Sequence, residues 1–196
     1  MTRQLRALPG NTAAAAVMEF ALVAPILLML ILGALEVGLN LYLRSVLEGA
    51  MAQAGRSSSL EAAQAGQTAI DNQVRTQVHA VLPDARVTFQ RSNYMTFSDV
   101  GRPEDFTDAN GNGTYDIGEC FTDENRNAQW DADVGADGLG GANDVVRYTA
   151  TLDYSGIIPD FTRLGISSNR RLTASTTLRN QPFSVQTAHV KPRICG

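Results

Sequence analysis

The sequence predicts an α+β fold in which a long N-terminal transmembrane, pilin-like helix is followed by a second helix and a small antiparallel sheet. Three observations predict this class. Residues 13–35 are apolar except for Glu19, residues 58–82 carry apolar side chains at helical spacing, and three later segments alternate polar and apolar side chains. About 160 residues follow the apolar segment, enough for one modest hydrophobic core. We therefore expect one membrane-inserted helix joined to one α+β domain.

The apolar segment 13–35 is long enough to cross a bilayer. About 23 residues at about 1.5 Å each form a helix of roughly 34 Å, against a hydrocarbon core of about 30 Å. Arg3 and Arg6 precede the segment and favour a cytoplasmic N-terminus, so the residues after about 36 should lie on the other side of the membrane. A cleaved secretory signal fits poorly, because the small residues precede the apolar run instead of following it.

The elements after the span follow from the period of the apolar residues. Leucine, valine and alanine continue one helical stripe to residue 54, so the first helix should reach residue 57. A second helix is expected over residues 58–82 and ends at Pro83. The period then changes to two, which predicts three or four strands, with segments 86–90, 146–152 and 172–178 among them.

Glu19 is the unusual residue of the apolar segment. A carboxylate at the centre of a spanning helix costs about 2.5 to 3.5 kcal/mol, and less toward the interface. One interpretation is that Glu19 marks the cytoplasmic edge of a span that runs from Phe20 to about Glu36. The other is that this acid has a role in assembly.

Segment 15–25, Ala-Ala-Val-Met-Glu-Phe-Ala-Leu-Val-Ala-Pro, resembles the start of a TadE-like pseudopilin. This family is a minor component of the tight-adherence (Tad) branch of type IV pili. Segment 179–183, Arg-Asn-Gln-Pro-Phe, is similar to the Arg-Asn-Glu-Pro-Phe sequence near the C-terminus of that family. The resemblance covers both ends of the chain and leaves residues 99–144 without a family motif.

The resemblance implies that a prepilin peptidase cuts between Ala14 and Ala15, which leaves Glu19 fifth and Phe20 sixth in the mature chain. Ala14 stands where the family usually has glycine. The new ammonium at Ala15 would lie about one turn from Glu19, where the two charges can compensate within a chain or between packed neighbours. Pro25 removes one helical hydrogen bond and permits a kink.

The same resemblance implies the domain organisation, location and partners. Residues 1–14 would be a cytoplasmic leader, 15–57 the N-terminal helix, and 58–196 an extracytoplasmic α+β domain. The protein would lie in the inner (cytoplasmic) membrane in contact with lipid as a single-pass protein, and could enter a surface pilus. Its partners would be the prepilin peptidase, other pilins and pseudopilins, and the Tad inner-membrane assembly platform.

Residues 99–144 form an acidic insertion. Twelve acidic residues stand against two arginines, a local charge of −10 in a chain whose net charge is −4. Residues 106–116 recur fifteen positions later as residues 121–131, and both copies keep Asp, Asn, Asn and Asp at relative positions one, three, five and nine. Alternating oxygen-bearing side chains on a tight loop are typical of sites for hard cations.

The first copy fits the full EF-hand loop pattern. Its ligands would be Asp108, Asn110, Asn112, the Thr114 carbonyl, Asp116 and Glu119, with Gly113 at the sharp turn. Flanking helices are not expected, because Pro103 precedes this loop and Cys120 follows it closely. The loops should therefore be bare calcium loops and not a paired EF-hand sensor.

The second copy has Asp123, Asn125, Asn127 and Asp131, but Ala128 replaces the turn glycine and Val134 the final acid. It would be incomplete unless Asp133 or Asp137 substitutes for that acid. Bound calcium would stiffen the insertion, since twelve acids repel one another. The alternative is an acidic surface insertion that binds nothing.

Cys120 and Cys195 both lie on the side expected to be translocated, where oxidation is possible. A disulfide between them is our hypothesis, with free or intermolecular thiols as the alternative. A zinc site is not favoured, because His79 and His189 are scattered and there is no close cysteine pair.

Motifs for catalysis are not visible, and the single lysine, Lys191, with the acidic surface argues against nucleic acid as a partner. The sequence thus predicts a minor pseudopilin that is a non-enzymatic assembly subunit for adhesion or secretion. The alternative is a signal-anchored, extracytoplasmic calcium-binding adhesion or sensor domain that does not polymerise. A tethered periplasmic hydrolase would need a site that the sequence does not contain.

Overall fold

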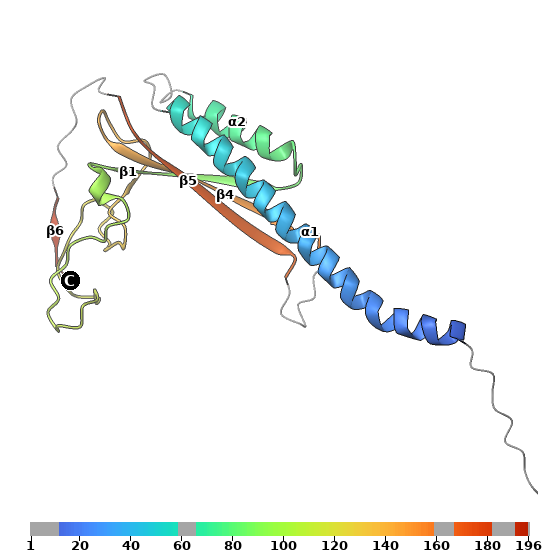
Figure 1. Cartoon of the computed structure of the whole chain (residues 1–196). Coiled ribbons are helices and arrows are strands. Elements are labelled where there is room, and N and C mark those ends of the chain that lie inside the picture. Colours follow the sequence, from blue (N-terminus) through green and yellow to red (C-terminus); the bar gives the residue numbers. More distant parts are fainter. Residues whose placement is uncertain (1–11, 59–65, 159–166, 182–190, 196) are drawn as a thin grey trace, which may run out of the picture. The chain divides into compact units, whose positions relative to one another are not determined.

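The computed structural model describes residues 12–58, 66–158, 167–181 and 191–195. Its elements are the helices α1 (Thr12–Ser58) and α2 (Gln67–His79) and six strands. The chain divides into two compact units, Met1–Leu41 with Gly156–Ser168, and Tyr42–Ser155 with Asn169–Gly196. The predicted α+β class, with a long apolar N-terminal helix, a second helix and a small antiparallel sheet, is confirmed (Figure 1).

In the first unit, the N-terminal part of α1 presents apolar side chains on all sides. Phe20, Leu22 and Leu30 are about two-thirds exposed or more, with relative accessibilities of 70%, 72% and 67%. The stretch Ala15–Arg56 is long and apolar enough to cross a membrane. A helix that is apolar around its whole circumference is typical of a membrane span, because water would not tolerate so much exposed apolar surface.

The second unit contains a four-stranded antiparallel sheet in the order β3-β1-β4-β5. Its strands are β1 (Arg86–Tyr94), β3 (Ala136–Asp137), β4 (Val145–Ser155) and β5 (Asn169–Arg179). Val87 lies opposite Leu152 in the β1–β4 pair, and Leu152 lies opposite Leu172 in the β4–β5 pair. The three predicted strands are all present, and each is longer than the alternating segment that predicted it.

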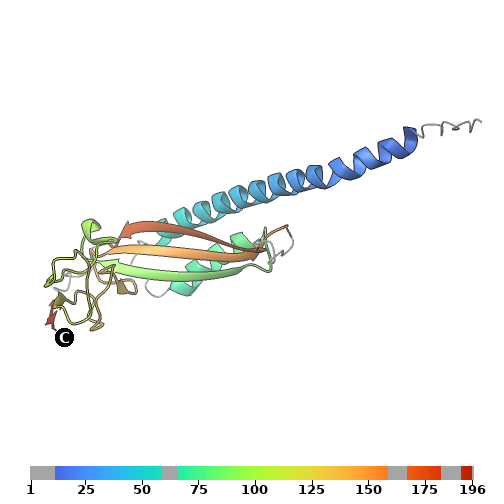
Figure 2. The same cartoon turned by 90° about the horizontal axis from the view of Figure 1, so that it is seen from below.

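Helix α2 and the part of α1 after Tyr42 cover the same face of this sheet (Figures 1 and 2). Side chains on alternate positions of β4 are buried, so that one face of the strand meets the helices. The close approach of α1 uses Gly55, where an added Cβ would lie 3.0 Å from Thr176 Oγ1. The buried apolar residues that form this core are Leu43, Leu47, Met51, Ile70, Val74, Val78, Val146, Ala150 and Leu152.

Helix α2 differs from its prediction at both ends. The described helix ends at His79, and the amides of Val81 and Leu82 bond back to the Val78 carbonyl in a final turn before Pro83. Residues 59–65, where the predicted helix begins, lie outside the described residues. Residues 182 and 183 of the Arg-Asn-Gln-Pro-Phe segment also lie outside them, but Asn180 is buried and its side-chain amide donates to the carbonyls of Leu139 and Gly141.

The acidic insertion connects β1 to β4. A 3-10 helix (Phe97–Asp99) lies at its start, and it contains the short strand β2 (Phe121–Thr122) and β3. Strand β2 pairs with β6 (Arg193–Ile194) in a second, two-stranded antiparallel sheet. The insertion therefore contributes a strand to a small sheet of its own, and the other strand comes from the C-terminal end of the described chain.

Candidate functional site

The first loop of the insertion, residues 108–119, is organised around the carboxylate of Asp108. Its oxygens accept the backbone N–H groups of Gly111 at 2.7 Å, Asn112 at 3.1 Å and Gly113 at 2.8 Å. The bond from Gly113 is the largest cause of a lowered pKa at Asp108. Gly111 and Gly113 have φ angles of 74° and 78°, in the left-handed region that favours glycine.

Glu119 closes this loop. Its Oε1 accepts the amide N–H of Ala109 at 2.8 Å, and its Oε2 accepts that of Asp116 at 3.1 Å. The side-chain amides of Asn110 and Asn112 both donate to Asp116 Oδ2, at 2.7 Å and 2.6 Å. Within the predicted first ligand set, Asn110 and Asn112 thus contact Asp116, and Glu119 bonds to the backbone near both ends of the loop.

The second loop, which starts at Asp123, has the same hydrogen bonds. The Asp123 carboxylate accepts the backbone N–H groups of Arg126, Asn127 and Ala128 at 2.6 Å, 3.2 Å and 2.9 Å. Arg126 and Ala128 have φ angles of 64° and 63°, at the positions where the first loop has glycines. The side-chain amides of Asn125 and Asn127 donate to Asp131 Oδ2. The missing turn glycine therefore does not prevent the loop conformation.

Glu104 closes the second loop. Its Oε1 accepts the amide N–H of Glu124 at 2.7 Å, and its Oε2 accepts that of Asp131 at 3.2 Å. Glu124 and Asp131 are the second and ninth residues of the second loop, and they correspond to Ala109 and Asp116 in the first loop. Glu104 is only 1% exposed, and this burial raises its pKa, against the effect of its backbone hydrogen bonds.

Asp133 and Asp137, the possible substitutes for this acid, line one cavity with Asn125, Asn127 and Asp131, but it is Glu104 that accepts the two amide N–H groups. Asp133 forms an ion pair with Arg147 and accepts a hydrogen bond from the Tyr94 hydroxyl at 3.0 Å, while Asp137 lies in β3. Val134, at the expected position, packs against Tyr94 and Val145. The sequence contained a signal for Glu104, because Glu104 and Glu119 are also fifteen positions apart and extend the repeat in the N-terminal direction.

The two loops are joined by backbone hydrogen bonds whose donors lie at equivalent positions of the repeat, as their acceptors do. The amide of Thr107 donates to the Cys120 carbonyl and that of Thr122 to the Asp105 carbonyl, both at 2.8 Å. The rings of Tyr115 and Trp130, which are equivalent in the repeat, stack with centroids 4.8 Å apart and an interplanar angle of 11°. Each loop is thus closed by the glutamate that precedes the other copy of the repeat: Glu119 closes the first loop and Glu104 closes the second. The loops are paired although no α-helix lies next to them among the described residues.

The donor set of both loops suits calcium, because every candidate ligand is an oxygen from a carboxylate, a side-chain amide or a carbonyl. Among the described residues, no group of three or more His, Cys, Asp or Glu side chains converges in an arrangement that could hold a metal ion. The loop oxygens instead accept N–H groups. An asparagine presents oxygen in place of N–H after rotation of its amide, so the chemistry of Asn110, Asn112, Asn125 and Asn127 fits either state.

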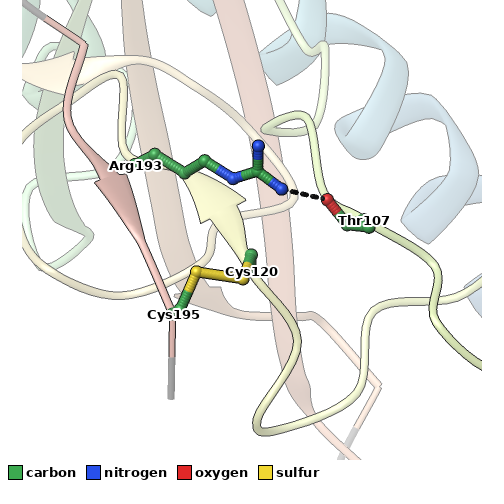
Figure 3. Close-up of a disulfide and its surroundings, with 4 residues drawn as sticks. All are labelled: Thr107, Cys120, Arg193 and Cys195. Atoms are coloured by element: carbon green, nitrogen blue, oxygen red, sulfur yellow. Dashed lines mark hydrogen bonds between the residues drawn. A yellow bond between two sulfur atoms is a disulfide. The ribbon is translucent and has the colours of Figure 1, made fainter.

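The C-terminal residues 191–195 hold the insertion from one side. A disulfide joins Cys120 to Cys195, as predicted, and Arg193 Nη2 donates to Thr107 Oγ1 at 2.9 Å (Figure 3). Lys191 Nζ lies 2.7 Å from Glu124 Oε2. Burial acts to raise the pKa of Glu124, but the bonds from Lys191 and Arg102 outweigh it and lower that pKa.

The predicted assembly residues lie on α1. Glu19, Phe20 and Pro25 are exposed, and the helix continues through Pro25. Ala15 is also exposed, whereas the side chain of Ala14 and residues 1–11 of the predicted leader lie outside the described part of the chain.

Exchanging the turn residues of the two loops should change stability in opposite directions. Ala128→Gly should raise the free energy of unfolding by about 1 kcal/mol, because alanine is strained at positive φ, and Gly113→Ala should lower it by a similar amount. An added Cβ at Gly113 meets no atom within 4 Å, so backbone strain alone is tested there. Urea unfolding followed by Trp130 fluorescence measures both changes, and a loss of stability in Ala128→Gly would contradict the assigned loop conformation.

Comparison with known proteins gives a match to a protein family. Residues 13–56 match the family described as TadE-like protein, which confirms the resemblance seen at the start of the apolar segment. The match ends within α1 and covers neither the sheet nor the insertion. No curated protein and no solved structure matches the chain.

Proposed function

We propose that this protein is a membrane-anchored, non-enzymatic structural subunit of a Tad-type pilus, a minor pseudopilin. The single observation that carries the proposal is the match of residues 13–56 to the TadE-like family, over the same helix that exposes apolar side chains on all sides. The apolar part of α1 would be held in the inner membrane, with the N-terminus in the cytoplasm and the sheet and insertion outside it.

Processing would prepare the helix for assembly. A prepilin peptidase would cut between Ala14 and Ala15, and the new ammonium would compensate Glu19 of the same chain or of a neighbour. The apolar circumference of α1 suits both stages, because it can contact lipid first and the helices of other pilins or pseudopilins later. At the Tad inner-membrane assembly platform, α1 would leave the lipid and pack against the helices of other pilins or pseudopilins.

We also propose that the insertion binds calcium through its two paired loops. The first loop would use Asp108, Asn110, Asn112, Thr114, Asp116 and Glu119, and the second Asp123, Asn125, Asn127 and Asp131 with Glu104 in the position of Glu119. The shared hydrogen-bond pattern and the oxygen-only donor set support this assignment. Bound calcium would neutralise part of the −10 charge of the insertion and stabilise it for adhesion or secretion.

The paired loops favour a second candidate function, a signal-anchored calcium-binding adhesion or sensor domain that does not polymerise. Processing separates the two candidates. The intact mass and N-terminal residue should be measured on protein from the membrane and from sheared surface material of the native cell. A chain that begins at Ala15 supports the pseudopilin, a chain that keeps residues 1–14 supports the anchored domain, and a start near residue 37 contradicts both.

Glu19→Ala should spare membrane insertion and lower incorporation into sheared fibres by at least about tenfold, because an ion pair in an apolar environment loses its partner. Glu48→Ala is the matched control, since Glu48 is an exposed α1 carboxylate that pairs only locally with Arg44 in a 2.8 Å ion pair. Immunoblots of carbonate-extracted membranes and of sheared material measure the two properties. Normal incorporation of the Glu19 variant would count against an assembly role.

A further inference from the structure

The membrane span of α1 has a defined end if the proposed function is correct, and this inference rests on that proposal. Residues 15–35 at about 1.5 Å each give a helix of roughly 31 Å, which fills a hydrocarbon core of about 30 Å. The next residue, Glu36, would therefore lie at the outer interface of the bilayer. Among the described α1 side chains before Leu43, Glu36 is the one that is buried, at 8% exposure.

The carboxylate of Glu36 accepts hydrogen bonds from the turn that follows β4. Its Oε2 accepts the backbone N–H of Ile157 at 2.7 Å and that of Ile158 at 3.3 Å. Gly156 precedes these residues, and a Cβ there would lie 2.2 Å from Glu36 Oε1. The amide of Gly156 donates to the Ser168 carbonyl at 2.7 Å, so a hydrogen bond joins these two residues between β4 and β5. All of these residues belong to the first compact unit, together with the apolar part of α1.

This arrangement meets the requirement that a bilayer interface places on a turn. A backbone N–H that leaves water without an acceptor costs several kcal/mol in an apolar medium, so lipid-exposed turns are not tolerated unless their polar groups are satisfied. Glu36 supplies acceptors for two consecutive amides of the turn. The side chains that the turn presents are apolar, with Ile157 46% exposed and Ile158 half-buried.

We propose that the turn 156–158 is a second membrane contact, in which Ile157 enters the boundary between headgroups and acyl chains beside α1. Lipid is the occupant because Glu36 holds the turn at the expected end of the span, where the side chain of Ile157 is 46% exposed. Glu36 is the positioning residue of this contact, and Gly156 leaves the space that the carboxylate needs.

Tryptophan substitutions in the full-length protein, reconstituted in phosphatidylcholine vesicles with brominated acyl chains, test this contact. Ile157→Trp reports the turn, Leu27→Trp reports the middle of the span, and Ile117→Trp reports the acidic loop, where carboxylates keep the chain in water. Trp130 is present in every protein, so the wild type gives the baseline. We expect Leu27→Trp to be quenched most strongly, Ile157→Trp to lose about half of its added fluorescence, and Ile117→Trp to lose little.

The Glu36→Ala substitution then tests the positioning role. In this background the quenching of Ile157→Trp should fall toward that of Ile117→Trp while Leu27→Trp is unchanged, whereas Glu48→Ala, the exposed control, should change neither. Quenching of Leu27→Trp without quenching of Ile157→Trp would overturn the membrane contact and leave the proposed span intact. Absence of quenching at Leu27→Trp would overturn both. Ile157→Trp quenching that does not respond to Glu36→Ala would overturn the role of Glu36.

Discussion

Replacement of Glu104 by alanine is expected to lower the free energy of unfolding by about 3 kcal/mol, because it leaves the amides of Glu124 and Asp131 without their buried acceptor. Each lost acceptor costs about 1 to 3 kcal/mol in a buried place. Glu104 is 1% exposed, so water cannot easily replace the carboxylate. Urea unfolding at constant pH, followed by Trp130 fluorescence, measures the loss.

The neighbouring acid provides the matched control. Asp105 has an 80% exposed side chain whose ion-pair distance to Arg102 is 3.6 Å, so Asp105→Ala should change the free energy of unfolding by less than about 0.5 kcal/mol. An equal loss in both variants would show that general charge, and not closure of the second loop, determines stability.

The same variants also test calcium binding, when their unfolding is measured with calcium and with a chelator. Ligand at about 100 times its dissociation constant raises the free energy of unfolding by about 2.7 kcal/mol for each site. The gain on adding calcium in place of a chelator should be lower in Glu104→Ala than in the wild type, and Glu119→Ala should lose the contribution of the first loop. A calcium gain that is unchanged in both variants would remove the metal hypothesis and leave the structural role of the glutamates.

Loss of the disulfide is the other large effect that we expect. The bond closes a sequence separation of 75 residues, and the chain-entropy relation gives about 4 to 5 kcal/mol for a loop of this length, as an upper figure. The double substitution of Cys120 and Cys195 by serine should therefore lower the free energy of unfolding by up to that amount. Reduction of the wild type should produce the same loss, and the double variant should not respond to reductant.

Arg193→Ala is the control for this experiment. It removes the hydrogen bond to Thr107 and keeps the disulfide, so a loss of about 1 kcal/mol is expected. If the double serine variant lost no more than Arg193→Ala, the pairing of β2 with β6 would hold the C-terminal segment without help from the covalent bond.

Much of the fold could be predicted because its signals are local. The alternation in residues 146–152 reflects burial of every second side chain of β4 against the helices, and the strand extends beyond the pattern because the residues at its ends also pair with β1 and β5. The end of α2 was less predictable, since Pro83 sets a limit but does not say how many residues of the last turn remain helical.

The candidate site shows the same division between local and distant information. The spacing within residues 108–119 predicted the first loop, including the acid that closes it. Glu104 was not predicted from the sequence, because the EF-hand pattern has its final acid at position twelve of the same loop. Glu104 instead precedes the first copy of the repeat, and pairing of the two loops places it against the second loop. Ala128 was read as a defect, yet the hydrogen bonds to Asp123 hold it at positive φ. No local pattern predicted the hydrogen bond from the Ile157 amide to Glu36, because 121 positions separate the two residues.

The position of Cys195 orders events in time. On the proposed topology, the chain crosses the membrane from the N-terminal helix onward, and the insertion emerges well before residues 191–195. Strand β2 cannot acquire its partner β6, and Cys120 cannot acquire its sulfur partner, until translocation has proceeded 75 residues further. On that topology, Cys120 would be a free thiol in an oxidising compartment during this interval. On the same topology, the Cys120–Cys195 disulfide would form only after the chain has crossed the membrane as far as Cys195, so its presence would mark a subunit whose export has reached that residue.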